Sequence, residues 1–270
     1  MKKITFSKIL LYVFLVIAGF ISIFPFYWIV SGATNMSVEI VRGRMIPGGN
    51  LLENWNTLFK TIPILMGFFN SLRNAVIGTA GSLFICSMAG YGFQIYRSKA
   101  KDRVMSILLL SMMIPFAAVM IPLFRLTSAL KLLNTTTGIV LPGLSTAFLI
   151  FFFRQCSQSF PMEIVQAARI DGVGEFGIYA RVYFPIMAPT FAAAGIVTFM
   201  GAWNNYLWPL IVLQKETSRT LPILITQLTQ AYVIDYGIIA LAITITTIPT
   251  MLVFITQQHR FVAGILGAVK

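Results

Sequence analysis

The residue types that carry most protein chemistry are scarce in this sequence of 270 residues. It has one histidine, His259, and two cysteines, Cys86 and Cys156. Two thiols and a lone histidine are too few for a metal site or for a nucleophile with its base. The sequence also lacks a Gly-x-x-x-x-Gly-Lys-Ser/Thr segment, so it has no P-loop with which to hydrolyse ATP. We expect no catalytic residue, no metal and no cofactor in this chain, and we do not expect an enzyme.

One cluster joins aromatic rings to amide groups within an apolar stretch. It contains Trp203, Asn204, Asn205, Tyr206 and Trp208. Polar groups are costly in an apolar span, so they usually face a cavity or a neighbouring helix. Rings that stack on a pyranose and amides that bind its hydroxyls would suit a sugar path through the first four of these residues. An interfacial aromatic belt with hydrogen bonds between helices is the alternative.

A polar segment, residues 154–181, carries helix signals of its own. Pro161 suits a first helical turn, Glu163 complements the helix dipole in that turn, and Asp171-Gly172 supplies a stop. These signals predict a helix of about three turns. A second short helix is expected over about 175–185, where the chain turns into the next apolar run.

The predicted helix has two possible surroundings. It could lie on the inner surface of a membrane, anchored to the lipid by the arginines that surround it. Against this, Ala167 and Ala168 offer little apolar area to lipid, whereas small side chains let another backbone approach closely. We therefore favour docking into a groove of a partner protein. The three arginines are Arg154, Arg169 and Arg181.

The rest of the chain is dominated by apolar runs. Hydrophobic residues make up 57% of it and charged residues 10%, with a mean hydropathy of +0.84. A bilayer core is crossed by about 20 apolar residues in a helix, so six charge-free runs each qualify as a span. We therefore expect an all-α integral membrane protein with six transmembrane helices. The runs are residues 9–38, 74–96, 104–124, 132–153, 182–214 and 236–258.

The charges lie between these runs and predict an orientation. With the N-terminus inside, the inner segments hold twelve of the twenty Lys and Arg, including Lys2, Lys3 and Lys8 before the first run and four in 97–103. The positive-inside rule then places both termini in the cytoplasm. The net charge of +12 fits membrane anchoring, and we expect no nucleic-acid partner. All eight acidic residues lie between the runs, which argues against a proton-coupled carrier.

The segment Gln166-Ala-Ala-Arg-Ile-Asp-Gly172, followed after nine residues by Val182-Tyr-Phe-Pro185, resembles the EAA loop of binding-protein-dependent ABC importer permeases. The resemblance implies a type I importer permease fold in which this loop is a coupling helix seated in a cleft of the ATPase. The implied coupling residues include Glu163, which is a candidate replacement for the usual glutamate. Gln166 occupies that glutamate's position and lacks its charge. The coupling residues are Glu163, Gln166, Ala167, Ala168, Asp171 and Gly172.

Similarity over nearly the whole chain implies the carbohydrate-uptake branch typified by the smaller subunit of the maltose permease. This implies a multi-pass protein of a prokaryotic inner membrane, surrounded by lipid, that pairs with a second homologous permease. Two cytoplasmic ATPase subunits would bind ATP and Mg²⁺, and an extracellular binding protein would deliver the sugar, with an oligosaccharide as the expected substrate. We divide the chain into an anchor helix with its loop (1–69), a permease domain (70–258) and a cytoplasmic tail (259–270). The matching segments are 112–115 with 121–123, 132–138, 199–210 and 258–270.

Overall fold

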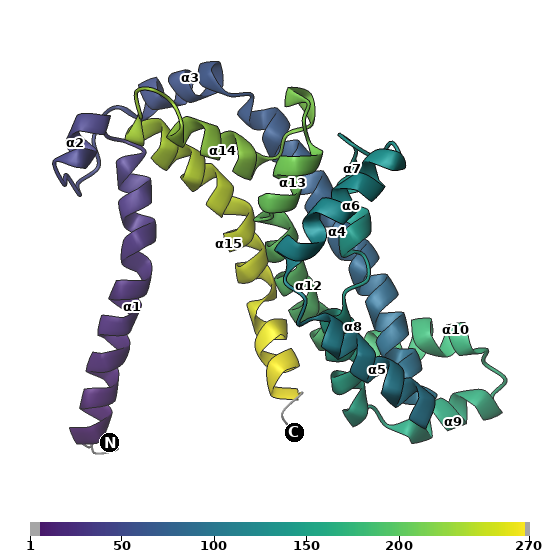
Figure 1. Ribbon diagram of the computed structural model, residues 1–270. Coiled ribbons are helices and arrows are strands. Elements are labelled where there is room, and N and C mark those ends of the chain that lie inside the picture. Colours follow the sequence, from purple (N-terminus) through teal and green to yellow (C-terminus); the bar gives the residue numbers. More distant parts are fainter. Residues whose placement is uncertain (1–5, 268–270) are drawn as a thin grey trace. The chain divides into compact units, whose positions relative to one another are not determined.

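The computed structural model describes residues 6–267, with side chains described for 7–259, and its regular structure in this range is helical (Figure 1). Lys2, Lys3 and residues 268–270 of the predicted tail lie outside the described residues. The prediction of an all-α protein is confirmed. The division at 69/70 and 258/259 stays a prediction.

Within the described residues, three helices are individually long and apolar enough to cross a bilayer. They match the first, second and sixth charge-free runs, because continuous apolarity without a break favours one straight helix. The last of them continues past 258 into the predicted tail. These helices are α1 (Phe6–Gly32), α4 (Ile64–Ile95) and α15 (Tyr236–Gly267).

The other three charge-free runs are not single straight helices, and here the sequence prediction is refined. The third run bends by 98° between α5 (Lys99–Ser111) and α6 (Phe116–Ala129), where Pro115 cannot continue the first helix. The fourth and fifth bend by 50° and 81°. Counting each bent pair as one span gives up to six spans in the described residues, in agreement with the prediction.

The remaining helices are short and either belong to these bent spans or connect them. They are α2 (Ser37–Val41), α3 (Leu51–Thr61), α7 (Thr136–Val140), η1 (Leu141–Gly143), α8 (Ala147–Cys156), η2 (Ser157–Ser159), α9 (Met162–Ile170), α10 (Glu175–Ile178), the π-helical turn η3 (Tyr179–Tyr183), α11 (Phe184–Ile186), α12 (Ala188–Trp203), α13 (Leu207–Val212), η4 (Glu216–Ser218) and α14 (Leu221–Thr229).

The chain forms two compact units, of which the first comprises residues up to Ile64 and Leu224–Ile248. Amide and hydroxyl side chains hold its connections together. Asn54 Nδ2 donates hydrogen bonds to the carbonyls of Ala33 and Asn35 at 2.9 and 3.0 Å. The Ser37 hydroxyl donates to Asp235 at 2.6 Å, and that carboxylate accepts from the amides of Gly237 and Ile238 in the first turn of α15. Asp235 therefore acts as the cap that begins α15.

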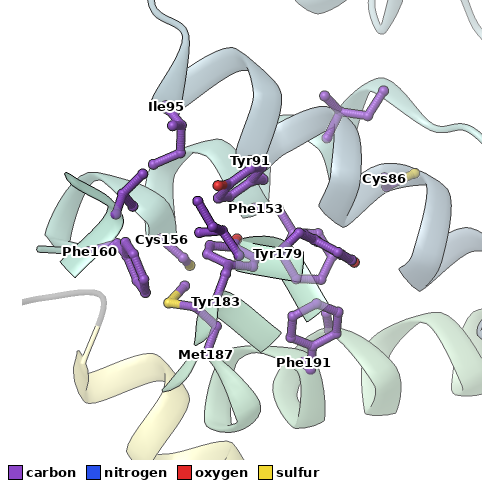
Figure 2. Close-up of a cluster of buried hydrophobic side chains, with 14 of the residues drawn as sticks. Cys86, Tyr91, Ile95, Phe153, Cys156, Phe160, Tyr179, Tyr183, Met187 and Phe191 are labelled. Carbon is purple, nitrogen blue, oxygen red and sulfur yellow. The ribbon is translucent and has the colours of Figure 1, made fainter. Parts of the chain in front are cut away.

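The second unit comprises Leu65–Ile223 and the residues from Pro249 onwards. Its core is built around six aromatic side chains contributed by α4, α8, α12 and the segment around α9, and we call this group the aromatic core (Figure 2). Each ring packs against at least one other, at centroid distances of 4.8 to 6.4 Å. The aromatic core is Tyr91, Phe153, Phe160, Tyr179, Tyr183 and Phe191.

Helices α4 and α8 of this unit approach each other closely at Gly90. A Cβ added there would lie 2.6 Å from Phe153 Cβ and 2.8 Å from the backbone nitrogen of Arg154. At Gly92, on the same helix, an added Cβ would meet nothing within 4 Å. Of these two glycines, only Gly90 is required by the helix crossing.

We expect Gly90→Ala to destabilise the protein, because the new methyl group collides with backbone that must move. Overpacking of this kind costs about 1–3 kcal/mol. The measurement is thermal denaturation of the detergent-purified protein, with Gly92→Ala as the matched control in open space. Equal melting temperatures for the two variants would contradict the assigned crossing.

Candidate functional sites

Helix α9 begins and ends where its sequence signals place it. Pro161 is the residue before the helix, Glu163 lies in the first turn, and Asp171 is the C-terminal cap. The Gly172 amide donates to Arg169 O and the Val173 amide to Ala168 O, both at 3.0 Å. With Gly172 at a φ of +76°, this is a Schellman stop, which glycine accommodates best. The predicted helix is confirmed at nine residues.

The two faces of α9 differ in their surroundings. Val165 is fully buried and Ala168 is 9% exposed, and both pack in the core of the second unit. The opposite face is exposed at positions three and four residues apart, which places them on one stripe. That stripe consists of Glu163, Gln166, Ala167 and Ile170.

The structure separates two neighbouring residues that the sequence assigns to the same partner contact. Ala167 and Ala168 are adjacent, and adjacent residues on a helix point in directions about 100° apart. Ala168 faces the protein's own core, while Ala167 is exposed. Sequence reasoning also missed Ile170, which is 86% exposed. Its spacing of four from Gln166 was the available signal.

The segment after α9 leads directly into the fifth apolar run. Helix α10 begins at Glu175, as predicted, and the chain bends by 81° around Met187, two residues after Pro185. Between them the π-helical turn η3 places Tyr179 and Tyr183 in the aromatic core. Their hydroxyls lie 2.6 Å from Ser87 Oγ and 2.7 Å from Ser157 Oγ. The buried hydroxyls of Tyr179 and Tyr183 therefore both have hydrogen-bond partners, and these bonds fix the turn to α4 and to η2.

A second candidate site is a cavity of about 560 Å³ in the same unit. Interruptions of three different bent spans meet at it. Phe116 follows the bend of the third run, Gly143 and Thr146 flank the bend of the fourth, and Asn204-Asn205 separates α12 from α13. At such interruptions backbone groups leave the helical ladder, which is tolerated at membrane depth where they line a cavity or are covered by protein.

Three of the four residues predicted for a substrate path line this cavity. They are Asn204, Asn205 and Tyr206. Trp203 does not line it. It is 1% exposed and packs against Phe68 and Phe199, at ring distances of 5.5 and 6.0 Å.

Trp208, from the same cluster, does line the cavity, and it also fixes the wall. Its indole Nε1 donates to Gly138 O at 3.0 Å, and its ring meets Phe116 edge-on at 6.2 Å. Asn134, at a φ of +61°, accepts hydrogen bonds from the Lys215 amide and the Ser218 hydroxyl at 2.6 and 3.1 Å. The segment 132–138 and the end of the fifth run are thus bonded to each other, which sequence order alone does not reveal.

Comparisons with known proteins agree on one family. Residues 87–266 match the family described as "Binding-protein-dependent transport system inner membrane component". The lactose transport system permease protein LacG of Rhizobium radiobacter is 46% identical over 96% of this chain and 95% of its own length. The arabinooligosaccharides transport system permease protein AraQ of Bacillus subtilis is 34% identical over 97% of this chain and 96% of its own.

A solved structure shares the fold. In the crystal structure of a bacterial ABC transporter involved in the import of the acidic polysaccharide alginate, one chain superimposes with a TM-score of 0.84. The match covers 97% of this chain and 100% of that one, at 21% identity. From the family match and the curated relatives together, this chain belongs to the inner membrane components of binding-protein-dependent transport systems.

Proposed function

We propose that this permease subunit carries a carbohydrate across the cytoplasmic membrane, driven by separate ATPase subunits that hydrolyse Mg-ATP. A second, homologous permease completes the pathway, and an extracellular binding protein delivers the sugar. The observation that carries the proposal is the two-faced helix α9, whose inner face is buried in the protein's own core while its outer stripe is exposed. A rigidly seated helix with a bare outer face is suited to receive force from a partner.

The ATPase would contact the stripe formed by Glu163, Gln166, Ala167 and Ile170. Ala167 permits close approach of the partner's backbone, and Ile170 contributes the apolar area that anchors such contacts. Glu163 lies one turn before Gln166 on the same stripe. It can therefore supply the carboxylate that Gln166 lacks for a basic residue of the ATPase.

The cavity near Asn205 is the proposed point of contact with the sugar. Its volume is within the range of ligand pockets, about 300–1,000 Å³, and its lining combines aromatic rings with amide and hydroxyl groups. The lining includes no Lys or Arg within the described residues, so the cavity favours a neutral sugar over an acidic one. The relatives named for lactose and for arabinooligosaccharides are consistent with a short neutral saccharide.

The proposed orientation places α9 in the cytoplasm. Arg154, at the end of α8, is ion-paired with Asp102 in the first turn of α5. The basic segment 97–103 and the segment containing α9 therefore lie at the same end of the second unit (Figure 1). This supports assigning both to the side that basic segments prefer, with both termini cytoplasmic.

The adjacent alanines offer a matched test of coupling. Ala167→Trp should leave the membrane level of the chain unchanged but abolish sugar uptake and co-purification of the ATPase, because the bulky ring blocks the docking stripe. Ala168→Trp should lower the level of the chain itself, since its ring would have to enter the core. Pull-down from detergent with subunit identification, combined with uptake in vesicles, measures both effects. A wild-type chain that is stable and active without an ATPase would sink the proposal.

The stop at Gly172 provides a second test, since it sets the direction in which the chain leaves α9. A Cβ at Gly172 meets nothing within 4 Å, so Gly172→Ala would act through backbone strain alone, at about 1–2 kcal/mol. We expect reduced uptake for Gly172→Ala and a smaller loss for Gly172→Asn, since asparagine tolerates this conformation. Gly174→Ser, in equally open space at a φ of −66°, is the control. Equal uptake for the alanine and asparagine variants would contradict the role of the stop.

The cavity makes a third prediction. Removing one stacking or hydrogen-bonding partner, by Tyr206→Ala or Asn205→Ala, should raise the apparent KM for uptake about fivefold, corresponding to about 1 kcal/mol. Val197→Ala, on an exposed part of α12, is the control. Uptake of a neutral disaccharide at a series of concentrations provides the measurement. An unchanged KM in both cavity variants would exclude direct sugar contact.

A further inference from the structure

A single aromatic ring joins two connections that are far apart in the sequence. Tyr96 follows the last residue of α4, and its ring lies 5.0 Å from Lys101 Nζ and 5.5 Å from the guanidinium carbon of Arg169. Lys101 also donates to Gly92 O at 3.1 Å and so satisfies a carbonyl in the last turn of α4. The end of α4 is thereby tied to the last turn of α9 by contacts between cations and an aromatic face.

Arg169 makes a second contact, across the stop at Gly172. Its Nε donates to Glu175 Oε1 at 2.8 Å and its second terminal nitrogen to Oε2 at 3.3 Å, which is the paired geometry of guanidinium with carboxylate. The guanidinium beside Glu175 lowers the pKa of that carboxylate below its ordinary value, so the carboxylate is charged at neutral pH. Arg169 thus bonds the end of α9 to the start of α10.

These contacts complete the attachment of α9 to the protein. Val165 and Ala168 hold its middle in the core, but one line of contacts along a helix leaves it able to pivot about that line. The group Tyr96, Arg169 and Glu175, which we call the clamp, adds a second point of attachment at the C-terminal end of α9. Two separate attachments resist rotation, which one alone permits.

The clamp is exposed to solvent, and this exposure limits how much it can contribute to folding stability. Tyr96 is 40% exposed, and the side chains of Arg169 and Glu175 are 37% and 48% exposed. Exposed ion pairs contribute little to folding stability, because water competes for both charges. A contribution to holding one helix in place, rather than to folding, fits this position.

We propose that Tyr96, Arg169 and Glu175 are positioning residues that make α9 a rigid lever, so that movement imposed on its outer stripe passes to α4 and α10 instead of being lost in rotation of the helix. The inference rests on the proposed coupling of α9 to an ATPase and goes beyond it, because the clamp does not lie on the docking stripe. Without the clamp, more ATP should be hydrolysed for each sugar imported, while the ATPase should stay bound to the permease.

The test uses the complete transporter in proteoliposomes, in which ATP hydrolysed and sugar imported are measured together. Tyr96→Ala, Arg169→Gln and Glu175→Gln should each raise the ATP consumed per sugar by about threefold or more. ATPase co-purification and melting temperature should stay at wild-type values. Tyr96→Phe retains the aromatic face but loses the hydroxyl that interacts with Glu175 and Arg169, so its ratio should lie between those of wild type and Tyr96→Ala. Arg181→Gln, an exposed arginine on η3 outside the clamp, is the control.

The ratio separates the possible outcomes, because a merely structural defect lowers hydrolysis and uptake in parallel and leaves it unchanged. A wild-type ratio in Arg169→Gln and Glu175→Gln would overturn the clamp even if Tyr96→Ala failed to fold. A wild-type complex with no ATP-dependent uptake would instead overturn the proposed function.

Discussion

The second unit depends on the packing of aromatic rings around Tyr183. This side chain is fully buried, contacts four other rings of the aromatic core, and places its hydroxyl 2.7 Å from Ser157 Oγ (Figure 2). Rings supply large buried area with few rotatable bonds, and the hydroxyl bond removes the cost of burying an oxygen. Because these rings come from α4, η3, α12 and the residue that follows η2, no one of these segments can move far without its neighbours.

The π-helical turn explains how two tyrosines contribute to the same core. Tyr179 and Tyr183 are four residues apart, and their rings stack at 5.6 Å with an interplanar angle of 24°. A π-helical turn has one more residue than an α-helical turn and is uncommon, often occurring where function requires a departure from regular geometry. Here it lies between α9 and the bend at Met187. The turn therefore joins the exposed helix to the interior of the bundle.

Much of this architecture follows from the sequence, because its strongest signals are physical necessities. A charge-free run of 21 or more residues must be covered by lipid or protein, and Pro161 with Asp171-Gly172 delimits α9. The bends were harder to predict, since charge-free runs report length and not direction. The run 104–124 has no charged residue at its 98° bend, and Pro115 is the local signal that lies there. A proline can interrupt a helix, but it does not give the angle of the bend.

The orientation of individual side chains was the part that the sequence left undetermined. Trp203 and Asn204 are neighbours, yet the first packs against Phe68 of another helix while the second lines the cavity. That division depends on which surface α12 turns toward α4, a tertiary contact with no local signal. The clamp is similar, since Tyr96 and Arg169 are 73 positions apart and meet only in the fold.

The position of α12 connects the two candidate sites. It begins at the 81° bend beside the aromatic core and ends where Asn204 and Asn205 interrupt the fifth run at the cavity. Its 16 residues form a rod of about 24 Å, and a helix resists compression along its axis. A displacement at α9 would therefore be transmitted along α12 to the cavity wall. If α9 receives work from separate ATPase subunits, as proposed, α12 is the element that passes this work to the cavity wall.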